Sequence, residues 1–214
     1  MDINRGTCWY SKGCANQMRR AVEETWWAPL DKSGHYGSLI KLLDVAFFEG
    51  CKTLIDVGCG VGTLQELPYV REHFTATGVD LPDVVDKAAI PLNPNGHFIR
   101  CDIVDDEPDI SFLGGYDLVI MNGFIDVMQH PLHVLDRILK HCKGHVLLHR
   151  QYLTEGPTYL TMHDSYGGES YASHINRREL DDVLEHNYVG IKRICLRSNE
   201  EWPDIYSFLW DVTP

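Results

Sequence analysis

Four residues in the first half of the chain have the types and spacing needed to hold a nucleotide. Gly58, Gly60 and Gly62 alternate directly after a short apolar run that is typical of a buried parallel strand. Glycines at this spacing let the backbone turn sharply and let a ligand approach the main chain, and a following helix would direct its first N–H groups at that ligand. Asp80 comes about 20 residues later, where a carboxylate can accept hydrogen bonds from two ribose hydroxyls. The pattern therefore predicts a site for a nucleotide-containing cofactor.

A second acid lies on the predicted strand itself and completes the pattern D-x-G-x-G-x-G over residues 56–62. This pattern resembles motif I of the class I S-adenosylmethionine-dependent methyltransferases. The alternative, a dinucleotide-binding turn, requires glycine or alanine at the position of Thr63. The resemblance implies that S-adenosylmethionine is the cofactor. The contacts it implies from this stretch are Asp56, Gly58, Cys59, Gly60 and Gly62.

Further cofactor contacts are implied near the ends of the next predicted strands, residues 76–79, 97–103 and 116–121. In the resembled family an acid after the third strand reads the adenine amino group, and apolar neighbours enclose the ring. Residues after the fourth strand, and a residue before the first, cover the methionine portion. The implied contacts are Asp80 for ribose, Asp102 with Leu81, Cys101 and Ile103 for adenine, and Asn122, Gly123 and Tyr36 for methionine. Near Tyr36 the alternative is a purely structural role, in which Ser33 or Ser38 caps the helix entrance.

Three histidines are candidates for the general base that a hydroxyl acceptor would need within hydrogen-bond reach. His149 comes first, because it ends the predicted fifth strand, residues 144–150, and ligands of open parallel sheets bind at that edge. His163 and His174 come next, in or beside the aperiodic stretch 151–173, which is longer than an ordinary connection and typical of a specificity loop. The alternatives are a strand-end histidine held by a backbone carbonyl, and a simple surface excursion.

Three other residues are predicted to contact the acceptor: Arg150, Asp126 and Tyr166. Asp126 takes the position at which many small-molecule methyltransferases have a histidine, so the local catalytic role departs from the family pattern. The acids within residues 105–109 are most simply a solvated loop, and no metal site is expected.

Apolar periodicity predicts the elements that position these residues. Their order predicts a Rossmann-like α/β fold, with a seven-stranded, mostly parallel sheet, an antiparallel C-terminal hairpin and helices on both faces. Residues 35–214 would form this domain, and residues 1–34 an N-terminal helical cap whose aromatic side chains pack on the domain or cover the substrate. Helices are expected at residues 14–27, 31–48, 131–141 and 177–186, the last with Asn176 as N-cap and Glu179 in a capping box, and the hairpin strands at 188–196 and 205–212.

Composition limits the kinds of partner, metal site and location that the sequence supports. The 214 residues carry a formal net charge of −12, which argues against a broad nucleic-acid surface. The seven cysteines are scattered and form no C-x-x-C pair, so neither a zinc site nor a disulfide framework is expected. No apolar run reaches the roughly 20 residues of a membrane helix, and the first ten residues lack signal-peptide character. A cytoplasmic location is therefore expected.

The sequence thus predicts an enzyme, an S-adenosylmethionine-dependent methyltransferase that acts on an oxygen of a small molecule or sugar. Residues 147–182 also resemble methyltransferases associated with sugar and polysaccharide loci. Two alternatives stay open. One is a methyltransferase for protein or nucleic acid, which the acidic charge and the lack of an N-P-P-Y-like tetrapeptide after the fourth strand disfavour. The other is a non-catalytic, cofactor-binding regulatory subunit.

Overall fold

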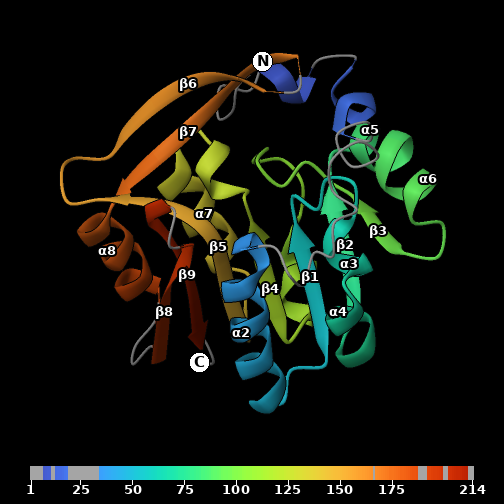
Figure 1. Cartoon of the computed structure of the whole chain (residues 1–214), viewed down its shortest axis with the longest axis horizontal. Helices are drawn as coiled ribbons and strands as arrows, with labels where there is room; N and C mark the ends of the chain where they lie inside the picture. The colour runs from blue at the N-terminus through green and yellow to red at the C-terminus, as the bar shows by residue number, and fades with distance from the viewer. Residues whose placement is uncertain are drawn as a thin grey trace.

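The computed structural model of the chain describes residues 7–10, 13–18, 34–165, 167–187, 192–199 and 202–211. Within these ranges one nine-stranded sheet has the order β3-β2-β1-β4-β5-β7-β6, and β9 pairs with both β5 and β8 (Figure 1). The strands are β1 (Thr53–Val57), β2 (Thr75–Asp80), β3 (His97–Arg100), β4 (Leu118–Asn122), β5 (His145–Thr154), β6 (Tyr159–Ser165), β7 (Gly168–Asn176), β8 (Lys192–Asn199) and β9 (Trp202–Asp211). The helices are η1 (Thr7–Tyr10), α2 (Gly34–Phe48), α3 (Thr63–Glu66), α4 (Pro68–His73), α5 (Pro82–Val84), η3 (Val85–Ala89), α6 (Ile90–Leu92), η4 (Ser111–Gly115), η5 (Ile125–Val127), α7 (Pro131–Leu139) and α8 (Arg177–Asn187).

The parallel strands β1 to β5 are covered on both faces. Alternate residues of β1 point in opposite directions, so that Ile55 packs in one core with Leu135 of α7, and Leu54 packs in another with Leu39 of α2. Strands buried on both faces are apolar along their whole length, which is why they stand out in the sequence. Together with the antiparallel pairing of β8 and β9, this arrangement confirms the predicted Rossmann-like α/β fold.

The sheet has more strands than the seven predicted, because the insertion after β5 is itself a β-hairpin. Strands β6 and β7 pair antiparallel, and β7 also pairs in parallel with the last residues of β5. The prediction of an aperiodic loop over residues 151–173 is therefore wrong. All but the last residue of β6 are exposed, so this strand has no buried face and no period-two pattern to reveal it.

Helix α8 begins where predicted, but its capping box is modified. Asn176 Oδ1 accepts the backbone N–H groups of Arg178 and Glu179 at 2.9 and 3.1 Å, which confirms the N-cap. The Asn176 N–H donates to Thr158 Oγ1 at 2.8 Å, and that hydroxyl donates to Glu179 Oε2 at 2.6 Å. Thr158 therefore bridges two residues that bond to each other directly in a capping box. Because Thr158 directly precedes β6, it also connects the start of α8 to the start of this strand.

The N-terminal segment is described only in part. Residues 14–18 are helical, as predicted, whereas residues 19–27 of the predicted helix lie outside the described residues. η1 packs against β7 so closely that a Cβ on Gly168 would lie 2.8 Å from the Cys8 backbone. Among the described helices, none is both long enough and apolar enough to cross a membrane.

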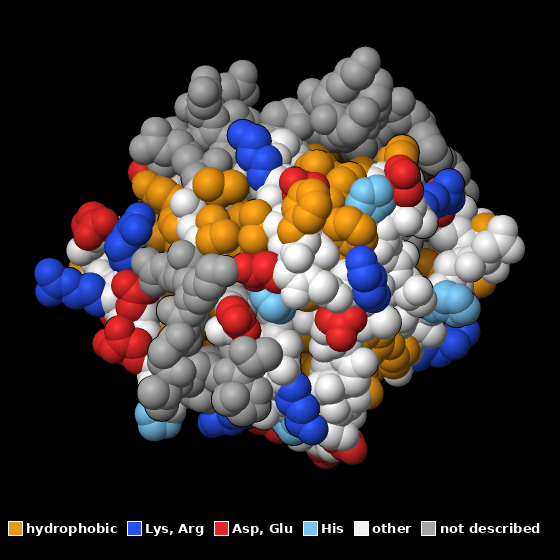
Figure 2. Space-filling view, turned by 90° about the horizontal axis from the view of Figure 1, so that it is seen from below, with side chains coloured by type: hydrophobic (Ala, Val, Ile, Leu, Met, Phe, Trp, Pro, Cys, Tyr) orange, Lys and Arg blue, Asp and Glu red, His pale blue; other side chains and the backbone are white. Residues whose placement is uncertain are grey.

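The two ends of the parallel sheet differ. At the amino ends of β1 and β4, Asp117 Oδ2 accepts the backbone N–H groups of Lys52 and Thr53 at 2.8 and 2.9 Å, and Tyr69 donates to Asp44 at 2.8 Å. Seen from this side, hydrophobic side chains form a band between scattered charged groups (Figure 2). The carboxyl ends lie on the opposite side, where the chain leaves a cavity.

Candidate functional site

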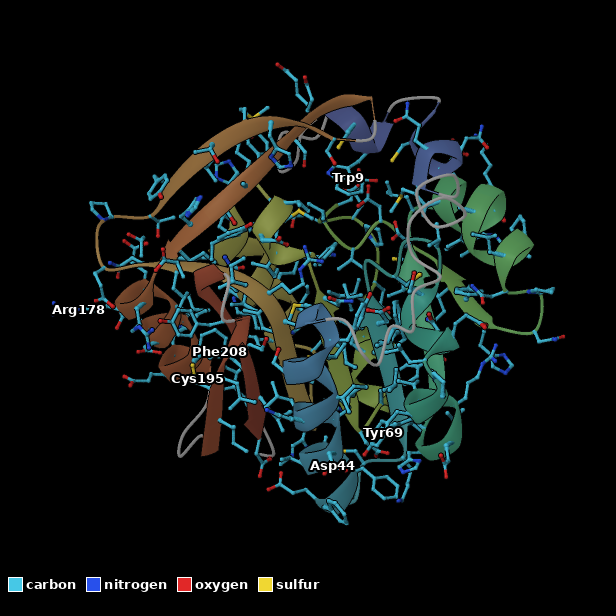
Figure 3. The ribbon with its side chains drawn as sticks, in the orientation of Figure 1. Trp9, Asp44, Tyr69, Arg178, Cys195 and Phe208 are labelled. Atoms are coloured by element: carbon cyan, nitrogen blue, oxygen red, sulfur yellow. The ribbon has the colours of Figure 1, made fainter. Side chains whose placement is uncertain are left out.

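A cavity of about 290 Å³ lies at the carboxyl ends of β1, β2, β4 and β5. The β6–β7 hairpin and the described N-terminal residues cover it. Trp9 belongs to η1, and it lies on the side of this helix that faces the strand ends (Figure 3). It lines the cavity together with Met18, His163 and Tyr171. This is the edge at which ligands of open α/β sheets bind.

The glycine turn after β1 forms one wall of the cavity. Gly58, Gly60 and Gly62 have φ angles of 72°, 55° and 81°, in the left-handed region that favours glycine. A Cβ on Gly58 would lie 2.3 Å from the Phe124 ring, and one on Gly60 would lie 2.9 Å from Met18. The helix expected after the turn is the four-residue α3, too short to contribute a significant helix dipole. The backbone of the turn itself therefore forms the cradle.

Asp80 ends β2 and joins this strand to the glycine turn. Its Oδ2 accepts the Gly60 N–H at 2.7 Å, and its Oδ1 accepts the Leu81 N–H at 2.7 Å. Each carboxylate oxygen has a second lone pair. Because Asp80 also lines the cavity, a ligand bound there would lie beside this carboxylate while its bonds to the Gly60 and Leu81 N–H groups are kept.

Two buried oxygens on the cavity wall, Asp56 Oδ1 and Asn122 Oδ1, have no hydrogen-bond partner among the described residues. Asp56 is 2% exposed, and burial, with the nearby Asp80 carboxylate, raises its pKa well above the ordinary value. Buried polar atoms without partners are rare and costly. A hydrogen-bond donor or a cation bound beside them would remove that cost, so these atoms indicate where a polar ligand fits.

Arg150 reaches the cavity through an irregularity in β5. The pairing of β5 with β9 shifts register between Leu148 and Gln151. Arg150 has a φ of 66° and is the only described non-glycine residue with a positive φ. Bulges of this kind redirect side chains near active sites. Burial raises the pKa of Asp126, which also lines the cavity, to about 6, and the charge of Arg150 opposes that rise. Arg150 Nε and Asp126 Oδ1 likewise lack hydrogen-bond partners within the described ranges.

The charges of the cavity suit a cationic ligand. The raised pKa of Asp56 favours its neutral form, yet the carboxylates of Asp80 and Asp126 still outnumber the single guanidinium of Arg150 among the described lining residues. Such a surplus creates a negative potential inside a cleft. S-adenosylmethionine carries a sulfonium, an amino group and two ribose hydroxyls, so the unpartnered oxygens and the glycine cradle fit this cofactor.

Four residues predicted to contact the cofactor lie outside the cavity lining: Gly62, Cys101, Asp102 and Ile103. Gly62 faces Asn93 instead, since a Cβ there would lie 2.7 Å from its amide nitrogen. Asp102 accepts a backbone N–H within its own loop at 3.1 Å, and Ile103 is buried in the core. The reason is that β3 is shorter than predicted, so residues 101–103 no longer continue the strand.

The structure separates the three candidate histidines. His163, on β6, lines the cavity. His149 is 1% exposed, and its Nδ1 lies 2.7 Å from Ser207 Oγ on β9, away from the cavity lining. His174 lies in a different pocket. Tyr166, predicted to contact the acceptor, is outside the described residues. The structure thus brings His163 together with Arg150 and does not bring the other two histidines there.

Several lining residues escape sequence reasoning. Phe124 follows Asn122 and Gly123 directly, so its place after the fourth strand could have revealed it. Tyr152 lies two residues past Arg150 on the same strand. Because the predicted strand ends at residue 150, the sequence does not place Tyr152 on it. Trp9 is one of the N-terminal aromatic residues for which the sequence leaves two roles open, packing on the domain and covering the substrate, and it lines the cavity. The other described lining residues not predicted are Met18, Val61, Thr63, Leu64, Val127, Met128, Ser165, Tyr171 and Ala172.

Comparison with known proteins agrees with this geometry. Residues 16–187 match the methyltransferase domain family, and no curated protein sequence matches the chain. The structure is similar to human N-acetylserotonin methyltransferase in complex with S-adenosylmethionine, at 18% identity and a TM-score of 0.65, over 96% of this chain and 58% of that one.

Two bacterial structures have similar extents. Magnesium protoporphyrin IX methyltransferase from Synechocystis PCC 6803, with bound S-adenosylhomocysteine, matches at 17% identity and a TM-score of 0.62, over 96% of this chain and 97% of that one. An amino pentose methyltransferase from Micromonospora echinaspora, with bound S-adenosylmethionine, matches at 16% identity and a TM-score of 0.59, over 90% and 97%. These likenesses concern the fold, whereas the family match spans most of the sequence and confirms the predicted enzyme class. The chain therefore belongs to the methyltransferase domain family and has the Rossmann-like fold of S-adenosylmethionine-dependent methyltransferases.

Proposed function

We propose that the protein transfers a methyl group from S-adenosylmethionine to a hydroxyl of a small molecule or sugar. The observation that carries this proposal is the convergence of four unpartnered buried polar atoms of the described chain on one cavity. They belong to Asp56, Asn122, Asp126 and Arg150. If these residues had a purely structural role, their unpartnered atoms would only destabilise the folded state. A bound cofactor and acceptor would give each of these atoms a partner.

The cofactor would occupy the half of the cavity next to the glycine turn. Asp80 would accept the ribose hydroxyls while it keeps its bond to Gly60. Asp56, Asn122 and Tyr36 would surround the methionine portion, where a positive amino group would hold the Asp56 carboxylate in its charged form. Bound there, S-adenosylmethionine supplies an electrophilic methyl group. The protein then has to hold the acceptor oxygen in line at ~3 Å and exclude water.

The acceptor would occupy the half nearer the hairpin. We assign proton acceptance to Asp126, with His163 as the second candidate, because both line the cavity. With a pKa of about 6, Asp126 is ionised at pH 7 and is still a useful base. Arg150 would orient the acceptor oxygen. A small acceptor suits the cavity, and solved structures of similar fold include methyltransferases of an amino pentose and of N-acetylserotonin.

Transfer of labelled methyl groups onto sugars, phenols and small acids tests the proposal. We expect transfer to at least one of these classes. Asp126→Asn should lower kcat roughly 100-fold or more, a loss much larger than its effect on the calorimetric affinity for S-adenosylmethionine. Asp83→Asn is the matched control, because that side chain is 77% exposed and is paired with Lys87. Cofactor binding with no transfer to any of the three classes would overturn the proposal and favour the regulatory alternative.

A further inference from the structure

A second pocket adjoins the methyl-transfer cavity, and Tyr152 lines both. It has a volume of about 410 Å³ and lies where β5 changes partners. At this point Tyr152 pairs with Ile205 of β9 on one side and with His174 of β7 on the other. Tyr152 is therefore the residue that the linings of the two spaces share.

An aromatic row crosses the second pocket. Tyr152, His174 and Tyr159 are direct cross-strand neighbours on β5, β7 and β6, so their side chains project from the same face of the sheet. The ring centroids of Tyr152 and His174 are 4.9 Å apart. Those of His174 and Tyr159 are 4.4 Å apart, and these two rings are almost parallel, at 7°. Tyr159 remains 47% exposed, although an aromatic ring of this size normally gains from burial.

Polar groups border this aromatic row. The Arg177 guanidinium lies 4.9 Å from the centroid of the Tyr206 ring, and its Nε is 3.5 Å from Glu155 Oε1, too long for a hydrogen bond. Asp204 lies exposed at the same pocket. The pocket thus combines carboxylate acceptors, a guanidinium donor and flat aromatic surface, and its acids outnumber its arginine.

We infer that this second pocket binds a sugar ring. The inference rests on the proposed function, and it implies that the acceptor has at least two rings, one beside Asp126 and one against Tyr159. A pyranose ring has an apolar C–H face that packs on an aromatic ring, and its edge hydroxyls are donors to carboxylates and acceptors from guanidinium. The surplus of acids disfavours a phosphate or a nucleotide, which Arg177 alone would have to neutralise.

Saturation-transfer NMR with four disaccharides, maltose, cellobiose, lactose and sucrose, tests the inference on the full chain. At least one disaccharide should receive saturation from the aromatic protons of the wild type. Tyr159→Ala should weaken its binding by about 3- to 10-fold. Met162→Ala is the matched control, because Met162 lies on the same strand with 48% exposure and does not line the second pocket. This control should bind as the wild type does.

Three results would overturn the inference. The first is that no disaccharide binds the wild type. The second is that Tyr159→Ala and Met162→Ala bind the disaccharide equally. The third is that uridine binds in place of the sugars and loses affinity in Tyr159→Ala, which would assign the aromatic row to a nucleobase. Failure of the proposed function is separately visible, since it would appear as absent methyl transfer while the sugar signal persists in the wild type and falls in Tyr159→Ala.

Discussion

The carboxylate of Asp80 accepts the backbone N–H of Gly60 at 2.7 Å, so the end of β2 is bonded directly to the glycine turn that follows β1. The second oxygen of Asp80 accepts the Leu81 N–H at the same distance. One side chain therefore shapes the cradle and also presents acceptor lone pairs to the cavity. A change at Asp80 should act on cofactor binding through both routes.

Asp80→Ala should weaken S-adenosylmethionine binding by at least tenfold, because hydrogen bonds to a charged group contribute about 1.5–3 kcal/mol. Asp80→Asn should bind with intermediate affinity, since it keeps one acceptor oxygen. Calorimetric titration measures both. Asp83→Ala, three residues further along and exposed, should leave the affinity unchanged. Equal affinities for Asp80→Ala and the wild type would remove the assignment of ribose to this carboxylate.

Gly58→Ala should cost more stability than Gly50→Ala. Both glycines have positive φ angles, 72° and 103°, so each alanine carries a backbone cost of about 1–2 kcal/mol. Gly50 has no atom within 4 Å of its added Cβ, whereas Gly58 would place the Cβ 2.3 Å from the Phe124 ring. This overlap should add roughly 1–3 kcal/mol. Urea unfolding of the two variants measures the difference. In a Phe124→Ala background, which removes the ring that the added Cβ would meet, Gly58→Ala should cost less stability than it does in the wild type. Equal losses in the two single variants would contradict the crowding at Phe124.

The sequence could reveal the parts of the fold that bury apolar residues at regular spacing. β1 and β4 are buried on both faces, so their apolar runs are diagnostic, and the glycines at the end of β1 mark the turn. β6 is exposed almost throughout, and its residues Tyr159 to Ser165 therefore lack the alternation from which a strand is predicted. For this reason the sequence does not predict the hairpin, which covers the cavity.

In the candidate site, the sequence predicts the residues whose direction depends on local pattern alone. Asp56 and Asp80 sit at strand ends, where local pattern decides their direction. His149 is two residues from Leu147, and this spacing places both on the face of the sheet that packs against α2. Arg150 enters the cavity because of a bulge, and the register shift depends on β9, more than 50 residues away in the sequence. No local pattern encodes that relation.

The bulge itself gives a test. Arg150 adopts a φ of 66°, which is costly for any residue with a Cβ. Arg150→Gly should therefore be more stable than Arg150→Ala by roughly 1 kcal/mol, because glycine adopts this conformation freely. Both variants lose the guanidinium and should lose acceptor binding equally. Thermal unfolding compares their stabilities, and similar melting temperatures would show that the bulge relaxes when the arginine is removed.

Asp126 makes the stability of the protein depend on pH. Burial raises the pKa of its carboxyl group to about 6, compared with about 3.9 in an unfolded chain. Between pH 4 and pH 6 the folded state therefore holds a proton that the unfolded state has released. The unfolding free energy must fall as pH rises through this window. For a shift of about two pKa units the loss is about 2–3 kcal/mol.

Asp126→Asn should abolish that loss, because an amide does not ionise. Relative to the wild type, the variant should gain about 2–3 kcal/mol of unfolding free energy between pH 4 and pH 7, as measured by urea unfolding at each pH. Asp83→Asn, whose side chain is exposed, is the control for the effect of an Asp→Asn substitution itself. Methyl transfer should move the opposite way: kcat/KM of the wild type should rise through pH 6 as Asp126 ionises and becomes able to accept the acceptor's proton. A wild-type kcat/KM independent of pH between 5 and 7, together with a flat stability difference for Asp126→Asn, would show that Asp126 is ionised throughout and is not the titrating base.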